Sequence, residues 1–161
     1  MELSGLDINR FIFTTPSIIN LEGKIQEKIF PQDIEPFANV IKGADFLLIR
    51  TGYSTFRNHD HRRYTQDYPV FSQEVATYLL ENFDTLIGVG VDCISVGSVK
   101  FHEDAVKVHQ ILNGMNATGK YVLILEDVNI PEDIKYIKKL FVIPLFIDLV
   151  DSLPVTVFCE I

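Results

Sequence analysis

The chain has 161 residues, an apolar fraction of 47% and a formal net charge of −8 at pH 7. That length suits one domain with a substantial core, and the acidic balance argues against binding to a nucleic-acid backbone. No apolar run approaches the roughly 20 residues that span a bilayer, and the amino terminus MELSGLDINRF lacks the features of a secretory signal. We therefore expect a cytoplasmic protein that binds neither nucleic acid nor membrane.

The first half of the chain alternates apolar runs with turn-forming residues. Residues 17–21 predict a strand, and residues 32–43 predict a helix that stops at Gly43. Residues 45–52 form an almost continuous apolar run that ends at Gly52, which is typical of a strand buried on both faces.

The segment 53–71 is polar, aromatic and without periodicity, so it predicts a long functional loop. If Phe56, Tyr64 and Tyr68 lined one pocket, this loop would bind a small molecule.

The second half continues the alternation. Ser72 is a natural N-cap for a helix that ends near Asn82. The other predicted elements are a strand at 85–92, a helix at 101–113, a strand at 119–127, and a terminal hairpin of strands at 140–147 and 154–161. We predict a single α/β domain over residues 1–161, with a mixed β-sheet and helices packed on it. The cysteines, Cys93 and Cys159, both lie in apolar runs, as expected of buried thiols in a reducing compartment.

The stretch GVGVD at 88–92 resembles part of a dinucleotide-binding fingerprint, but its third glycine position is Cys93. Glycines that allow close packing of a strand are the better interpretation. Asp92 ends this strand, where α/β proteins place ligands. It is equally well interpreted as a buried carboxylate that accepts hydrogen bonds from the following turn.

Two sets of residues could bind a metal. His59 and His61 form an H-x-H pair that would chelate a metal if the segment were extended, although a solvated loop is the commoner explanation. His109 lies on an apolar helical stripe, and Glu126 ends the next strand, so the two side chains would project near one end of the sheet. Such a pair suits zinc or manganese. From spacing alone, a core histidine and a strand-end carboxylate are favoured.

Five motifs occur in an order typical of one family: GADFLLIRTGY, PVFSQEVATYLLENFDTLIGVGVDCISV, VHQIL, VLILEDVNI and FVIPLFIDLVDSLPVTVF. From about Leu6 to the last residue, the chain resembles the cyclase or kynurenine formamidase-like family of metal-dependent hydrolases.

This resemblance implies a cyclase-type fold of the swivelling β/β/α kind and hydrolysis of an amide, a formamide or a cyclic ester or amide. It implies that His109 and Glu126 are ligands of a divalent metal, zinc or manganese. Asp92 matches the acid of the family's G-[IV]-D-x-x-S-V turn, which implies a supporting role. The substrate would be a small molecule.

The chain also departs from the family pattern. The signature H-x-G-T-H-x-D is absent, since the first histidine is His59, and the segment NGMNATGKY is longer than usual. The chain could be a truncated enzyme, could complete its site with a partner, or could be a non-catalytic paralogue that self-associates or binds a small molecule. Edge strands left unpaired would favour a homodimer or larger oligomer.

Overall fold

A computed structural model describes residues 5–23, 27–150 and 152–161. At its centre is a four-stranded parallel sheet in the order β2-β4-β6-β7. Its strands are β2 (Pro16–Asn20), β4 (Phe46–Arg50), β6 (Gly88–Val91) and β7 (Leu123–Leu125). The middle strand β4 is buried along its whole length, as its apolar run predicted.

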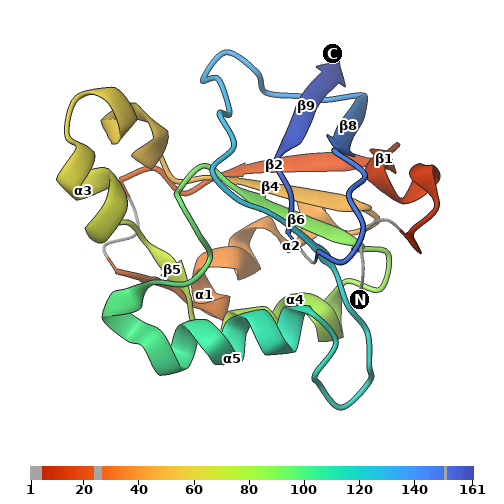
Figure 1. Cartoon of the computed structure of the whole chain (residues 1–161), viewed down its shortest axis with the longest axis horizontal. Helices are drawn as coiled ribbons and strands as arrows, with labels where there is room; N and C mark the ends of the chain where they lie inside the picture. Colours follow the sequence, from red (N-terminus) through yellow and green to blue (C-terminus); the bar gives the residue numbers. More distant parts are fainter. Residues whose placement is uncertain (1–4, 24–26, 151) are drawn as a thin grey trace.

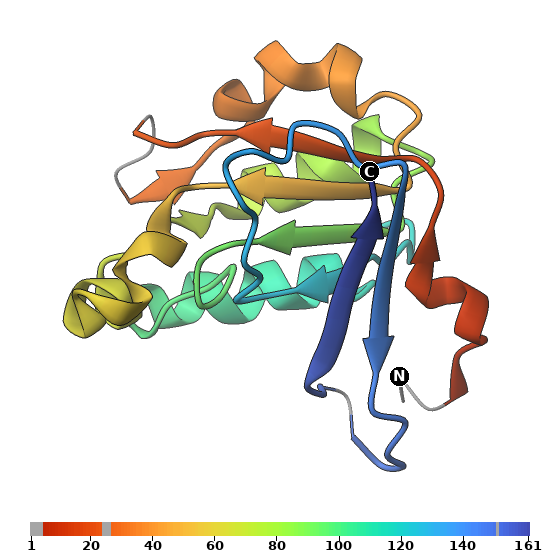
Figure 2. The same cartoon turned by 90° about the horizontal axis from the view of Figure 1, so that it is seen from above.

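A second sheet is antiparallel and has the order β1-β8-β9. It consists of β1 (Ile12–Phe13), β8 (Lys139–Pro144) and β9 (Val155–Glu160). The predicted terminal hairpin is therefore confirmed, and it stands on one face of the parallel sheet (Figures 1 and 2). The α/β fold class is also confirmed. Parallel and antiparallel strands lie in separate sheets. A third, small sheet is the parallel pair of β3 (Lys28–Ile29) and β5 (Val70–Phe71).

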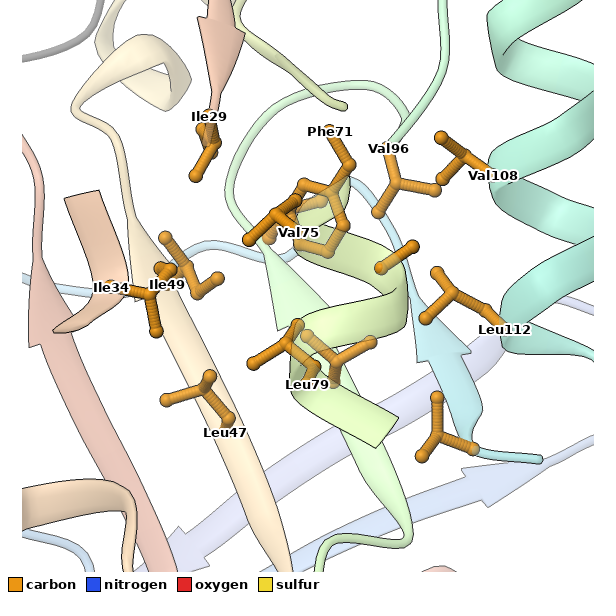
Figure 3. Packing of buried hydrophobic residues seen from close by; sticks show 14 of the residues in the cluster. Ile29, Ile34, Leu47, Ile49, Phe71, Val75, Leu79, Val96, Val108 and Leu112 are labelled. Carbon is orange, nitrogen blue, oxygen red and sulfur yellow. The ribbon is translucent and has the colours of Figure 1, made fainter. Parts of the chain in front are cut away.

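Helices cover the opposite face of the parallel sheet, where α4 (Gln73–Asn82) and α5 (His102–Leu112) lie side by side (Figure 1). Their buried residues join those of the sheet in the larger of two apolar cores (Figure 3). The smaller core lies under the antiparallel sheet. Short 3-10 helices, η2 (Ile8–Phe11) and η5 (Val99–Phe101), precede β1 and α5.

The helix predicted from Ser72 is confirmed, since the Ser72 hydroxyl accepts a hydrogen bond from the Val75 amide at 3.1 Å and the helix ends at Asn82. The region predicted as a helix over residues 32–43 is helical from 31 to 41, but it is not one regular α-helix. That region consists of α1 (Pro31–Ile34), the 3-10 helix η3 (Glu35–Phe37) and α2 (Ala38–Ile41). Pro36 explains the interruption, because its ring lacks an amide hydrogen and clashes with the preceding turn.

The long loop predicted for residues 53–71 is also wrong. The segment forms the 3-10 helix η4 (Tyr53–Asn58), the helix α3 (His61–Gln66) and β5. Asp60 initiates α3 by accepting a hydrogen bond from the Arg63 amide at 3.0 Å. Because both helices are short, they leave no apolar periodicity in the sequence to reveal them.

The glycines of β6 confirm the packing interpretation of GVGVD. Val89 and Val91 belong to the helix-side core, whereas Gly88 and Gly90 alternate with them. A Cβ atom at Gly88 would lie 2.3 Å from the ring of Phe46. Bare backbone at these positions therefore makes room for the Phe46 ring on the hairpin side of the sheet.

None of the helices in the described part of the chain has the length and apolar character needed to cross a bilayer. Cys93 is buried as predicted, and burial raises the pKa of its thiol. Cys159 is partly exposed because it lies on β9, at the edge of its sheet.

Candidate functional site

His109 and Glu126 meet at the carboxyl end of β7. Glu126 follows the last residue of that strand, and His109 projects from α5. The His109 Nε2 and Glu126 Oε1 atoms lie 3.3 Å apart, and the side chains remain 37% and 32% exposed. His109 is therefore not an isolated core histidine, the explanation that spacing alone favoured.

One carboxylate oxygen of Glu126 receives all the hydrogen bonds that hold this side chain. The Ser95 hydroxyl and the Val96 amide donate to Oε1 at 2.7 Å and 2.9 Å. The Ser95 hydroxyl also accepts a hydrogen bond from the Gly97 amide, so the turn itself fixes its direction. Oε2 makes no hydrogen bond to any residue that the structure describes, and it is the oxygen available to a ligand.

The second ring nitrogen of His109 fixes its tautomer. Nδ1 lies 2.8 Å from the carbonyl oxygen of Ala105, which can only accept a hydrogen bond. Nδ1 therefore carries a proton, and in the neutral ring the lone pair belongs to Nε2, which faces Glu126. A backbone acceptor on the far nitrogen is the usual support of a metal-binding histidine.

The two side chains also shift each other's pKa. The hydrogen bond to Glu126 raises the pKa of His109 against the opposing effect of burial. Burial disfavours the charged form of Glu126, but hydrogen bonds from His109, Val96 and Ser95 outweigh it and lower its pKa. Without a ligand, this pair is an ion pair in mildly acidic solution.

Gly97 allows the turn at residues 92–98 to approach α5. A Cβ atom at this position would lie 2.6 Å from the Cβ of Ala105 and 3.2 Å from Cε1 of His109. Gly97 and Ser95 were not among the predicted site residues, although both lie between a strand and a helix, where a site is expected.

Asp92 lies in the same turn but supports another part of it. It is fully buried and accepts hydrogen bonds from Thr51 N at 2.7 Å, Thr51 Oγ1 at 2.5 Å and Gly52 N at 2.9 Å. Of the two interpretations of Asp92, the structure therefore agrees with that of a buried carboxylate that accepts hydrogen bonds. The donors belong to the turn after β4, not to the turn that follows Asp92.

His59 and His61 do not form the extended pair that chelation would require. His59 directly follows η4 and His61 begins α3, on either side of the capping residue Asp60. Both imidazoles are exposed to solvent. Helical backbone on both sides of Asp60 breaks the alternation that would place the rings on one face.

The three aromatic residues of the same segment have different surroundings. The Tyr68 hydroxyl donates to the Gly97 carbonyl at 2.7 Å, and Tyr68 lines a small cavity of about 130 Å³. Neither Phe56 nor Tyr64 lines that cavity. Phe56 instead packs against Tyr53, and Tyr64 packs under the guanidinium of Arg57.

A larger cleft of about 1230 Å³ opens beside the His109–Glu126 pair. Its walls come from β7, the 128–131 segment and the antiparallel sheet, and its lining is mostly apolar, with Phe46, Leu140 and Val157 among the contributors. The pair therefore lies on the wall of a space that suits an apolar small molecule.

The pair fits a divalent metal in donor type but not in number. A neutral imidazole nitrogen and a carboxylate oxygen are ordinary zinc and manganese ligands. Over residues 5–23, 27–150 and 152–161, however, no three His, Cys, Asp or Glu side chains gather closely enough to hold a metal ion. A third ligand of one of these four residue types would have to come from outside this part of the chain.

Comparison with known proteins matches the chain to a family model described as "Putative cyclase" over residues 3–98. That match includes Asp92 and ends before His109 and Glu126. An uncharacterized protein of Haemophilus influenzae is 24% identical over 91 residues, which cover 56% of this chain and 64% of that protein.

Two solved structures share the fold. Isatin hydrolase A from Labrenzia aggregata, bound to benzyl benzoate, matches with a TM-score of 0.69 and 18% identity, over 91% of this chain and 60% of that one. Isatin hydrolase A from Ralstonia solanacearum matches with a TM-score of 0.71 and 14% identity, over 97% of this chain and 62% of that one. The chain thus spans less than two thirds of the length of each of these relatives.

Proposed function

Because the chain belongs to the cyclase family, we propose that it is the part of a metal-dependent hydrolase that carries His109 and Glu126 as metal ligands. The proposed substrate is a small amide, formamide or cyclic ester or amide. The main support is the 3.3 Å approach of His109 Nε2 to Glu126 Oε1 beside an apolar cleft.

The residues around the pair would have distinct tasks. Ser95 and Val96 hold Oε1 of Glu126 and leave Oε2 for the ligand, while the Ala105 carbonyl keeps the lone pair of His109 on Nε2. The apolar cleft would exclude water from the substrate and bind its aromatic or aliphatic part. A divalent metal, when bound, supplies Lewis-acid activation of water and of the substrate carbonyl.

The fold also supports a class of substrate. The two structural neighbours are named isatin hydrolases, and isatin contains a cyclic amide. We therefore take isatin and formanilide as assay substrates for the cyclic amide and the formamide.

Metal content tests the proposal. Protein purified without chelator is expected to carry close to one zinc or manganese ion per chain by elemental analysis, and the His109→Ala variant is expected to lose it. His59→Ala is the control, since that imidazole is exposed and outside the pair. Folded protein that carries no metal, and binds none when zinc is added, would contradict the proposal.

A non-catalytic, self-associating or ligand-binding role is the second candidate. It is favoured by the small number of ligands, since the described residues contain no group of three that could hold a metal. In that case the chain would be folded and metal-free, would hydrolyse neither assay substrate, and would still bind an apolar molecule in the cleft.

A further inference from the structure

A guanidinium from the η4 segment reaches the residue that follows Glu126. Arg57 Nη2 donates to the Asp127 carbonyl at 2.8 Å and also contacts the Asp127 carboxylate. The same nitrogen lies 3.1 Å from the Tyr64 hydroxyl, and the guanidinium packs over the Tyr64 ring at 5.3 Å. Arg57 and Asp127 are 70 positions apart, so this contact joins two distant segments.

The residue that Arg57 contacts, Asp127, has an unusual backbone conformation. Its φ angle is 61°, in the left-handed region that residues other than glycine rarely adopt. Its amide donates to the Cys93 carbonyl at 2.9 Å, so its backbone is held from one side by the turn and from the other by Arg57. The Asp127 amide holds the 126–127 peptide on Cys93, and Arg57 holds the following peptide through the Asp127 carbonyl. Both peptides that flank the Cα of Asp127 are therefore held, which keeps its backbone left-handed directly after Glu126.

We propose that Arg57 is a positioning residue, which holds Asp127 in its left-handed conformation and so keeps the Glu126 carboxylate on Ser95, Val96 and His109. The proposal rests on the proposed function only in treating Glu126 as a metal ligand. The geometric part, that Arg57 controls where Glu126 lies, stands apart from any metal.

The exposure of the ion pair argues against a role in stability alone. The Arg57 and Asp127 side chains are 40% and 44% exposed, and ion pairs this exposed contribute little to the free energy of unfolding. A contact that orders Asp127 can nevertheless change the position of the neighbouring Glu126 carboxylate, the proposed metal ligand.

The same segment supplies a matched control. Arg62 is an exposed arginine on α3, five positions from Arg57, and it makes no ion pair with any described residue. Arg62→Gln therefore removes the same charge from the same short segment without touching Asp127.

The first measurement uses metal-free protein and the amide resonance of Val96, whose proton is hydrogen-bonded to Glu126 Oε1. In Arg57→Gln we expect this proton to move upfield and to exchange faster with solvent, whereas in Arg62→Gln it should stay at its wild-type position. Asp127→Asn should also keep the wild-type resonance, because its side chain retains an acceptor oxygen for Arg57 and asparagine tolerates a positive φ. If Arg57→Gln fails to fold, Arg57→Lys is measured in the same way.

The second measurement is zinc affinity by titration calorimetry. Loss of a residue that orients a metal ligand typically lowers affinity about 10- to 100-fold, so Arg57→Gln should bind zinc at least about 10-fold more weakly than Arg62→Gln. If the Val96 proton has the same shift in both variants, the proposal is overturned. If wild-type protein binds no zinc but the Val96 proton moves only in Arg57→Gln, the proposed function fails and the positioning role of Arg57 stands.

Discussion

The pKa shifts of His109 and Glu126 make the stability of the folded chain depend on pH. The raised pKa of His109 means that its contribution is fully present below the ordinary value of 6.5 and is lost as pH rises through the folded value. The lowered pKa of Glu126 means that its contribution is present above the ordinary value of 4.5 and is lost as pH falls. The pair therefore stabilises the fold most between these two values.

We predict that His109→Gln lowers the melting temperature of metal-free protein most near pH 5.5. The difference from wild type should shrink toward pH 9, because the wild-type imidazole loses its proton there. Thermal melts across this range measure it. His59→Gln, which alters an exposed imidazole, should follow the wild-type curve at every pH. A His109→Gln difference that does not vary with pH would contradict the prediction.

At the level of single residues, the sequence predicted which two side chains meet better than it predicted which residues hold them in place. His109 and Glu126 could be paired because they lie on consecutive elements. Ser95 is near Glu126 only after the turn has folded back, and Arg57 reaches Asp127 from 70 positions away. No local pattern encodes contacts of that kind, since they depend on how distant elements are brought together.

At the level of elements, the segment at 128–137 depends on one buried arginine. Arg50, at the end of β4, is only 3% exposed and donates to the carbonyls of Ile130, Pro131 and Ile134 at 3.2, 2.6 and 2.8 Å. This segment leads from Glu126 toward β8 and forms part of the wall of the large cleft. Arg50 therefore ties this segment to the end of β4.

We predict that Arg50→Met destabilises the fold by about 2–4 kcal/mol, because the carbonyls of Ile130, Pro131 and Ile134 lose a charged donor whose side chain is buried. Urea denaturation measures the loss. Cleavage by trypsin after Lys135, in the released segment, should become faster than in wild type, whereas Arg62→Met should leave both quantities unchanged. Wild-type cleavage kinetics in Arg50→Met would show that the segment is held by other contacts.

Among the elements, those with strong periodicity or long apolar runs were predicted well, and short ones were not. The helix after Ser72 has both a cap and an apolar stripe, and its bounds are confirmed. The helices η4 and α3 contain six residues each, too few for a periodic pattern to develop. In residues 32–43 the periodicity was present, but the constraint of Pro36 on its neighbours decided the backbone.

At the level of the whole molecule, exposed apolar side chains are concentrated at the carboxyl-terminal end. Between residues 145 and 161 they are Leu145, Phe146, Ile147, Leu149, Val155, Phe158 and Ile161. In the same region β9 forms the edge of its sheet, and Phe158 stacks on Phe141 with ring centroids 4.7 Å apart. An edge strand with so much apolar surface tends to pair with another chain.

We predict that the chain self-associates through this end, and that Phe158→Ser shifts the protein toward monomer in sedimentation velocity experiments. Val99→Ser is the control, because Val99 is 85% exposed but lies in η5, outside this region. Equal sedimentation of the two variants at every concentration would argue against the hairpin as the contact surface.

The resemblance to cyclases was visible in the order of five motifs, and the family is confirmed over residues 3–98. The arrangement of the two sheets relative to each other was harder to predict from the sequence. A terminal hairpin predicts antiparallel pairing, but whether it extends the parallel sheet or stands on its face depends on contacts such as that of Ile12 with Phe141, far apart in the chain.

The division of the interior into two apolar cores has a further consequence for local opening. The helix-side core is the larger, and the core beneath the antiparallel sheet is smaller. Structure supported by fewer buried contacts opens at lower free energy, so β8 and β9 should exchange their amide hydrogens sooner than β4 and β6. Val96 packs beside Val108 in the larger core (Figure 3). Ser95 directly precedes Val96 in the chain, and His109 directly follows Val108. The residues that hold Glu126 would therefore keep their arrangement while the hairpin opens, and the cleft could admit and release a molecule without disassembling the pair on its wall.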